Sequence, residues 1–395
     1  MKWIYKLLAF LSNFSIGLVS PILSLMLCQH GCSLKNIGLA VAVFSITVIV
    51  TEVPSGIFAD MHGRKLSFIA SRIAGALSAA VMLLSHSFAL TAAGLSLMGL
   101  STAFASGTLD ALAVEDAVRQ KGMSVMTRVV SSFLTFQCAG LAGGALIGGF
   151  LPYSGGYALH LLIKCAVCLA TTLVALTLPH EVRLSAEKTA HPLRFHLSKM
   201  IHLFSKSPVL KDIAICIISI SIVQAALETY WQPQLSGIFT NGVQTVLGML
   251  SAAAYLATTF GCIFLGRARI DNPQRCWIIY LFMGGGLALL TALLSFASNA
   301  VFFSIVYIAL YLLIGMLSVS EQTIINRETS DDVRASLLSV TSFAARMGGI
   351  ISGVVSSLLL TGGNISLVWR ITALVTVVGL AVVSIGRFCI EKSRD

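Results

Sequence analysis

Charged residues are scarce in this chain of 395 residues. They make up only 11% of it, and Asp and Glu together number 16 against 26 Lys and Arg. A soluble domain is typically about 25% charged, because its surface must face water. With a hydrophobic share of 56% and a mean hydropathy of +0.90, the chain cannot cover its surface with polar groups. The composition therefore excludes an ordinary soluble protein and indicates that lipid is the solvent.

Signatures of catalysis and of cofactor binding are also missing. The sequence contains no Walker A loop, no H-E-x-x-H and no G-x-S-x-G motif, so we expect neither an enzyme nor drive by ATP within this chain. Most of the nine cysteines lie inside apolar runs, where they pack as small hydrophobic groups. The eight histidines are scattered, and we expect no metal site and no bound cofactor.

The net charge of +10 does not indicate a nucleic-acid partner. The Lys and Arg residues lie in short connections between apolar runs, not on one amphipathic face or in a tail. Placed in this way, they are typical of residues that hold loops on the cytoplasmic side of a membrane. We therefore expect the lipid bilayer, and no nucleic acid, as a partner.

The chain is rich in long apolar runs. A membrane-spanning helix needs about 20 predominantly apolar residues, and in lipid the backbone must be hydrogen-bonded within a helix or a closed barrel. The runs are too long and too uniformly apolar for barrel strands, so we predict an all-α membrane protein with twelve transmembrane helices. The predicted spans are Ile4–Leu27, Ile37–Phe58, Leu66–Ser85, Ala89–Ala113, Ser124–Leu151, Tyr157–Leu178, Val209–Tyr230, Val243–Leu265, Cys276–Phe296, Ala300–Ser320, Val333–Leu360 and Leu367–Phe388.

Basic residues mark every second connection between the predicted spans. They occur before the first span at Lys2, after the second at Arg64 and after the fourth at Arg119, while the intervening loops contain almost none. Lys and Arg favour cytoplasmic loops. The alternation therefore predicts a multi-pass protein of the cytoplasmic (inner) membrane with both termini cytoplasmic.

One long polar connection, residues 179–208, falls at the midpoint of the chain. It divides the sequence into an N-terminal bundle of six helices, residues 1–178, and a C-terminal bundle, residues 209–395. Alignment of the halves superposes Gly140 on Gly349 and Gly144 on Gly353, which indicates an internal repeat. Duplicated units of this kind are typical of transporters that hold substrate between their halves.

The most specific motif connects the second and third spans. The stretch Gly56-Ile57-Phe58-Ala59-Asp60-Met61-His62-Gly63-Arg64-Lys65 resembles the G-x-x-x-D-x-x-G-[RK]-[RK] loop of the major facilitator superfamily. We expect Gly56 to permit close approach of two helices, Gly63 to permit a tight turn and Asp60 to complement the dipole of the next helix. The resemblance implies the major facilitator fold, with two pseudo-symmetric six-helix bundles. It also implies a conformational latch, whose members here are Gly56, Asp60, Gly63, Arg64, Glu115, Asp116 and Arg128.

Glycines in the fifth span carry a second resemblance. The stretch from Gly140 to Gly149 is similar to the g-x-x-x-G-P-x-x-G-G signature of the drug–proton antiporters of this superfamily, with Ala145 in the position of the proline. The resemblance implies export coupled to protons. The same spacing is typical of helices that pack through small residues, and this alternative stays open for Gly140, Gly144, Gly148 and Gly149.

Polar residues deep inside the spans are candidates for contact with a substrate. A charge at the bilayer centre costs at least about 2.5 to 3.5 kcal/mol on insertion scales, so such residues usually face a cavity or a partner. Lys164 could instead extend its ammonium group outward, and Arg346 could belong to a structural ion pair. The predicted substrate-binding residues are Gln137, Lys164, Gln224 and Arg346.

Three carboxylates are candidates for proton coupling: Glu228, Asp110 and Glu52. A carboxylate withdrawn from water near the outer end of a span, as Glu228 would be, is suited to bind and release a proton. Glu52 and Asp110 lie at a depth similar to that of Arg72. We therefore expect one of these two to form a structural ion pair with Arg72.

These features predict a monomeric secondary transporter that works by alternating access on a small-molecule substrate, with the proton gradient as driving force. The leading hypothesis is proton-coupled efflux of small amphipathic molecules or drugs. One alternative is a dedicated exporter or importer of one anionic metabolite, such as a carboxylate siderophore, because two basic residues would line the path. The other is a non-transporting membrane sensor built on the same fold.

Overall fold

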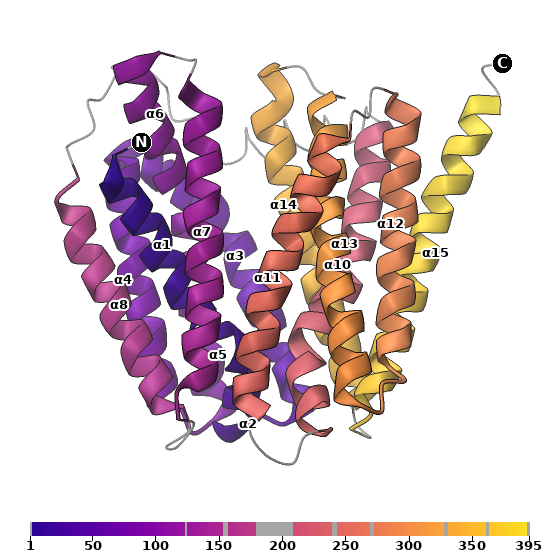
Figure 1. The fold of residues 1–395 in the computed structure, drawn as a ribbon, viewed down its shortest axis with the longest axis horizontal. Coiled ribbons are helices and arrows are strands. Elements are labelled where there is room, and N and C mark those ends of the chain that lie inside the picture. The colour runs from indigo at the N-terminus through magenta and orange to yellow at the C-terminus, as the bar shows by residue number, and fades with distance from the viewer. Residues whose placement is uncertain are drawn as a thin grey trace. The chain divides into compact units, whose positions relative to one another are not determined.

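The computed structural model describes residues 2–122, 125–152, 157–178, 208–238, 243–268, 272–327, 331–360 and 363–392. Across these ranges the regular structure is entirely helical (Figure 1). Twelve stretches are long and apolar enough to cross a membrane. The predicted fold class, an all-α protein with twelve membrane-length helices, is confirmed.

The chain forms two compact units. Unit 1 comprises Met1–Asn36, Val43–Ala190 and Thr240–Tyr255, and unit 2 comprises Ile37–Ala42, His191–Phe239 and Leu256–Asp395. The predicted connection at residues 179–208 lies almost wholly outside the described residues. The division of the chain into residues 1–178 and 209–395 therefore stays a prediction.

Most of the helices belong to one unit each. Those of unit 1 are α1 (Trp3–Gly17), η1 (Ser20–Ile22), α2 (Leu23–Gln29), α4 (Arg64–Leu83), α5 (Phe88–Ala105), α6 (Leu109–Lys121), α7 (Met126–Phe150) and α8 (Ala158–Leu176). Those of unit 2 are α10 (Pro208–Ser236), α12 (Pro273–Leu294), α13 (Ala300–Arg327), α14 (Asp331–Leu359) and α15 (Ile365–Lys392). Two more, α3 (Leu34–His62) and α11 (Val243–Arg267), contribute residues to both units.

The first and fourth spans are interrupted, whereas their apolar runs predict continuous helices. In the first, the short 3-10 helix η1 carries Pro21, which has no backbone N–H to continue the hydrogen-bond ladder. In the fourth, α5 and α6 are separated by a turn in which Gly107 has a φ of +65°. Asp110 consequently lies in the first turn of α6, where its carboxylate complements the helix dipole.

The loop between α3 and α4 is a tight turn at Gly63. This residue has φ +98° and ψ 150°, and it both ends α3 and precedes α4. Residues with a side chain rarely adopt such a positive φ. The expected role of Gly63 in a tight turn is confirmed.

Helix α7 lies so close to α1 that only glycine fits at the contact. A Cβ atom at Gly144 would meet the carbonyl oxygen of Phe14 and would lie 2.8 Å from the nitrogen of Leu18. At Gly140 it would meet the Phe10 carbonyl oxygen, and at Gly148 that of Leu18. The three glycines, spaced four residues apart, therefore form one face on which the two backbones touch, as small-residue packing requires.

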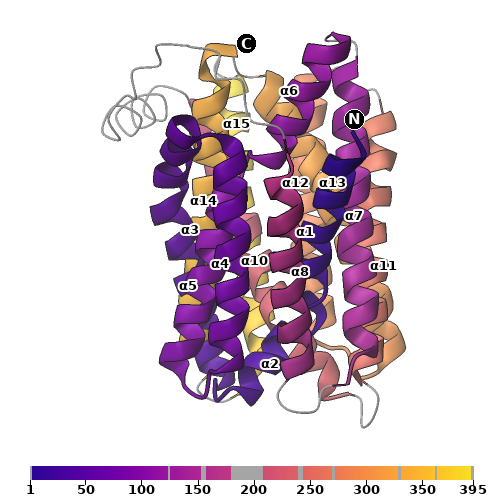
Figure 2. The same ribbon diagram turned by 90° about the vertical axis from the view of Figure 1, so that its left-hand side faces the viewer.

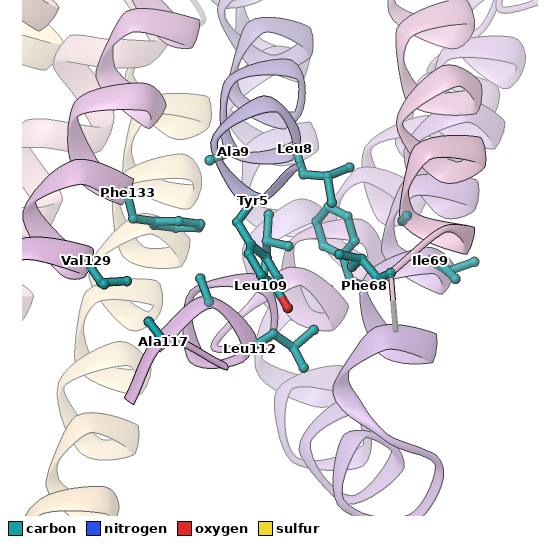
Figure 3. Packing of buried hydrophobic residues seen from close by; sticks show 13 residues of the cluster. Tyr5, Leu8, Ala9, Phe68, Ile69, Leu109, Leu112, Ala117, Val129 and Phe133 are labelled. Carbon is teal, nitrogen blue, oxygen red and sulfur yellow. The ribbon is translucent and has the colours of Figure 1, made fainter. Parts of the chain in front are cut away.

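A hydrophobic cluster joins five helices of unit 1 (Figure 3). Its aromatic members come from α1, α4 and α7, as Tyr5, Phe68 and Phe133, and α6 adds Leu109 and Leu112. Ala175 extends the cluster to α8. The short helix α6 is thus anchored by its apolar face. Its charged residues Asp110, Glu115, Arg119 and Lys121 are exposed, whereas Asp116 is buried.

In unit 2, α10 packs against α12, α14 and α15. Two hydrogen bonds tie α15 to it: the indole Nε1 of Trp369 donates to the carbonyl oxygen of Ala226 at 3.2 Å, and the Thr376 hydroxyl donates to that of Ser219 at 2.6 Å. Helix α10 is thus in contact with three other helices of unit 2.

Candidate functional site

Three of the predicted site residues come together in unit 2. On α10, the side-chain amide of Gln224 donates a hydrogen bond to the Glu228 carboxylate, with Nε2 and Oε1 3.0 Å apart. The positive charge of Arg346, on α14, acts electrostatically on the same carboxylate. An acid, an amide and a guanidinium group therefore form one cluster, here called the Glu228 cluster.

The local sequence explains how the cluster is positioned. Gln224 and Glu228 are four residues apart, so they lie on the same face of α10 one turn from each other. Gly348 lets α14 approach that helix, since a Cβ there would lie 2.6 Å from both the carbonyl oxygen of Ile218 and the Cβ of Ser221. Close contact of the two backbones brings Arg346 within electrostatic range of Glu228.

The three residues of the Glu228 cluster differ in their exposure, in a way that allows the carboxylate to exchange one ligand for another. Glu228 is exposed, while Gln224 and Arg346 are half-buried. The carboxylate can therefore be reached by a proton or a cationic group, and its hydrogen bond with the Gln224 amide fixes its orientation. Such a carboxylate can alternate between a charged state paired with Arg346 and a neutral, protonated state.

Sequence reasoning missed a second carboxylate of unit 2, Glu321. It is half-buried on α13, and the phenol of Tyr280 on α12 donates to its Oε2 at 3.3 Å. The predicted tenth span ends at Ser320, which places Glu321 in a loop. Helix α13 in fact continues to Arg327. The helix formers Glu321 and Gln322, followed by two further apolar residues at 324 and 325, were the available signal.

An ion pair between the ends of two helices lies in the same unit. The guanidinium of Arg387 on α15 lies 3.5 Å from the Asp212 carboxylate on α10, and it stacks 3.6 Å from the ring centroid of Trp277 on α12. Stacked and paired guanidinium groups fix geometry well because they are planar. This contact therefore holds the ends of three helices together.

The remaining predicted coupling and substrate residues lie in unit 1 and do not form a second cluster of the same kind. Gln137 on α7 and Glu52 on α3 are half-buried, and Asp110 is exposed. Lys164 on α8 is buried, and its Nζ lies 3.9 Å from the thioether sulfur of Met98 on α5. Their predicted roles stay predictions.

The expected ion pair of Arg72 with Glu52 or Asp110 is not formed. The guanidinium Nε of Arg72 donates to the Ser71 hydroxyl at 3.0 Å, and the group lies over the Phe68 ring at 5.4 Å. Neither carboxylate is among its partners in the described part of the chain. Asp110 is instead displaced to the first turn of α6 by the break at Gly107.

Several predicted latch residues do meet in unit 1. Arg64 at the start of α4 forms an ion pair with Glu115 on α6. Asp116 on the same helix lies 2.9 Å from the Lys2 ammonium and 3.6 Å from Arg119. These contacts tie the loop after α3, the middle of α6 and the N-terminal Lys2 to one another.

The other latch residues have different settings. Asp60 and Arg128 are exposed. The expectation that Gly56 permits close helix approach is wrong, because a Cβ atom there would have no described neighbour within 4 Å. Gly149 on α7 is also buried, but it lies against α11, where a Cβ atom would be 2.6 Å from the Cα of Gly248. Among the described residues, no group of three or more His, Cys, Asp or Glu could hold a metal ion.

The sequence and the fold both have known counterparts. Residues 7–352 match the profile of the Major Facilitator Superfamily. The uncharacterised MFS-type transporter YxaM of Bacillus subtilis (strain 168) is 24% identical over 394 residues, which cover 98% of this chain and 94% of that protein.

Two solved structures share the fold over nearly the whole chain. The nucleoside transporter NupG has a TM-score of 0.75 and 19% sequence identity. A variant of NupG has a TM-score of 0.80 and 15% identity, and each comparison covers 97% of this chain and 98% of the other. At these identities the likeness shows the fold and carries no information about the substrate.

Proposed function

Because the chain belongs to the major facilitator superfamily and is thus a secondary transporter with twelve membrane spans, we propose that it exports small amphipathic molecules in exchange for protons. The Glu228 cluster carries this proposal. Its carboxylate is the coupling group, and the substrate binds through Glu228, Gln224 and Arg346. The protein acts as a monomer in the cytoplasmic membrane, with both termini in the cytoplasm.

Exchange follows from competition for one carboxylate. When Glu228 is charged, it attracts the cationic part of a substrate; when it is protonated, that attraction is lost. Bound proton and bound substrate therefore exclude each other at Glu228. A carrier that can cross between its two states only with one or the other bound exchanges them obligatorily.

The charges of the cluster also suggest the type of substrate. A zwitterion can place its cationic group at Glu228 and its anionic group at Arg346, so that neither protein charge is left unpaired. The amide of Gln224 adds a hydrogen-bond donor that fixes orientation. Since charged groups within spans are costly unless paired, a substrate that pairs both is bound more favourably than one that pairs a single charge.

A second candidate function rests on Arg346 alone. A dedicated carrier for one anionic metabolite would pair the anion with Arg346 while Glu228 is protonated, and substrate and proton would then move together. The two candidates differ in the sign of coupling: exchange in the first, co-transport in the second.

Reconstituted protein separates these candidates. Proteoliposomes with an acidic lumen would receive an amphipathic zwitterion, a lipophilic cation of similar size or a tricarboxylate on the outside. Exchange predicts that the zwitterion accumulates in the acidic lumen, more than the cation and far more than the carboxylate. Because exchange is reversible, random orientation of the protein does not alter the direction.

Two results would count against exchange. Carboxylate uptake driven by acid outside, with no zwitterion accumulation, would establish the anionic carrier instead. Saturable binding of the zwitterion without flux under any gradient would establish a sensor on a transporter fold.

A further inference from the structure

Two buried cations lie on neighbouring helices of unit 1. Arg72 on α4 and Lys164 on α8 are each only 5% exposed. Helix α4 packs against both α5 and α8 (Figure 2). The two charges are close enough for the Arg72 guanidinium to repel the Lys164 ammonium group.

Neither cation has a negatively charged partner in the described part of the chain. Arg72 donates one hydrogen bond, from Nε to the Ser71 hydroxyl at 3.0 Å, and it lies over the Phe68 ring. The acceptor nearest Lys164 is the thioether sulfur of Met98 at 3.9 Å, which is a weak acceptor. Two strong donors therefore have only neutral partners.

Helices α4, α5 and α8 are in direct contact next to these two side chains. The Ser101 hydroxyl of α5 donates to the carbonyl oxygen of Ser71 at 2.7 Å, directly beside Arg72. One turn further on, a Cβ at Gly75 would lie 3.2 Å from the Ser101 Oγ and 3.3 Å from the Sγ of Cys168, itself one turn from Lys164. The three helices are thus in close contact beside the two cations, which favours a small ligand over a large one.

The chemistry of the two cations requires compensation. A guanidinium group stays protonated in proteins, and an isolated buried charge is strongly disfavoured unless it is paired. A second cation nearby raises that cost. A small anion that accepts hydrogen bonds from the terminal nitrogens of Arg72 and from Nζ of Lys164 satisfies both groups at once.

We propose that the junction of α4, α5 and α8 binds a small monovalent inorganic anion of the halide type between Arg72 and Lys164. The site lies in unit 1 and uses none of the residues of the Glu228 cluster. It therefore stands whether or not the proposed proton exchange is correct. Lys164, which the sequence predicts as a substrate contact, here has an inorganic ligand.

Thermal unfolding of the purified full-length protein tests the site. The unfolding temperature would be measured in sodium gluconate and during titration with sodium chloride or bromide at constant ionic strength. We expect a saturable rise with either halide, because a ligand that binds only the folded protein stabilises it. In Arg72→Gln and Lys164→Met the halide concentration for half-maximal rise should increase by about tenfold or more, which corresponds to about 1.4 kcal/mol of binding free energy.

A matched control is Lys121→Gln, which removes an exposed cation of the same unit at the end of α6. It should leave the halide response unchanged. Equal unfolding temperatures of the unmodified protein in gluconate and in halide would overturn the proposal. So would an unchanged halide response in both Arg72→Gln and Lys164→Met, since the halide would then bind elsewhere.

Crystals of the unmodified protein soaked in bromide provide a measurement that does not depend on the variants folding. An anomalous peak between Arg72 and Lys164 is expected, and its absence at occupancy-saturating bromide would contradict the site. Protection by acetate but not by chloride or bromide would also overturn it, because the ligand would then be a carboxylate, such as part of an organic substrate.

Discussion

At the scale of single residues, Glu228 concentrates the chemistry that a coupled carrier needs. Its carboxylate is held by Gln224 and faces the charge of Arg346, so its protonation changes the net charge of a small region inside a membrane span. Neutralising Glu228 removes the attraction between its carboxylate and the Arg346 guanidinium, and such a change in pairing is costly inside a membrane span. Protonation is thus able to favour a different arrangement of α10 and α14.

The neutral amide at this position should separate coupling from binding. In Glu228→Gln, the proton site is lost, so we expect no accumulation of substrate in proteoliposomes with an acidic lumen. Exchange of labelled for unlabelled substrate across the membrane should persist at a reduced rate, because Gln224 and Arg346 remain. Both quantities are measured by uptake of radiolabelled substrate.

The two other predicted coupling carboxylates are the comparison. Asp110→Asn and Glu52→Gln should retain accumulation driven by the pH gradient. If accumulation survives in Glu228→Gln and disappears in one of these variants, that other carboxylate is the coupling group.

The ion pair between Arg64 and Glu115 should matter more for transport than for stability. Their side chains are 33% and 63% exposed, and exposed ion pairs contribute about 0 to 1 kcal/mol. We expect Glu115→Gln to leave the unfolding temperature nearly unchanged while lowering the initial rate of substrate exchange, since the predicted role of the latch is to set the balance between conformations.

Charge reversal tests whether the pair itself is responsible. The double variant Arg64→Glu, Glu115→Arg should recover much of the exchange rate that either single reversal loses. If the double variant instead loses as much activity as the two single variants together, the two residues act independently.

At the scale of the helices, the contact between α1 and α7 is set by glycine. Gly140, Gly144 and Gly148 place the two backbones in direct contact, with no room for a side chain. The antiporter resemblance and the packing alternative therefore describe the same residues at different levels. The packing role is visible in the structure, whereas the implied role in export stays a prediction.

A methyl group at Gly144 should be costly. In Gly144→Ala the new Cβ would collide with the Phe14 carbonyl oxygen and lie 2.8 Å from the Leu18 nitrogen, so α1 and α7 must separate. Overpacking of this kind typically costs about 1 to 3 kcal/mol. We expect a lower unfolding temperature in detergent, measured by intrinsic fluorescence.

Gly285 on α12 provides the matched control, since a Cβ there would meet no described atom within 4 Å. Gly285→Ala should be neutral or stabilising by up to about 1 kcal/mol, because glycine in a helix interior is less favourable than alanine. Equal destabilisation by both substitutions would show that the effect comes from helix propensity and not from the α1–α7 contact.

Apolar runs predict where helices lie but not where they break or end. Hydropathy treats residues 89–113 as continuous, although Gly107 adopts a positive φ and separates α5 from α6. It also stops at Ser320, although α13 continues to Arg327 and carries Glu321. Backbone turns and polar helix ends are decided by local conformation and tertiary contacts, which average hydropathy does not record.

The same limit applies to side-chain partners. The i, i+4 spacing of Gln224 and Glu228 is readable in the sequence, and the structure forms that hydrogen bond. That no described carboxylate pairs with Arg72 cannot be read from the sequence, because depth along a span does not specify the face of a helix. Likewise the motif around Gly56 does not show what faces this glycine, and a Cβ atom there would meet no described atom within 4 Å.

At the scale of the whole molecule, the chain is a secondary transporter of the major facilitator superfamily, not an enzyme. Its units carry different charge arrangements. Unit 2 holds the Glu228 cluster, in which opposite charges face each other, and unit 1 holds the two buried cations Arg72 and Lys164. We propose that unit 2 exchanges substrate for protons and that unit 1 binds an inorganic anion.

The most direct test of the central claim records proton and substrate movement in the same vesicles. Proteoliposomes with an acidic lumen and a trapped pH-sensitive dye would receive the amphipathic zwitterion outside. Exchange predicts that the lumen becomes more alkaline as the zwitterion enters, with both signals lost in Glu228→Gln. Entry of the zwitterion with no change in luminal pH, or with acidification of the lumen, would contradict proton exchange at Glu228.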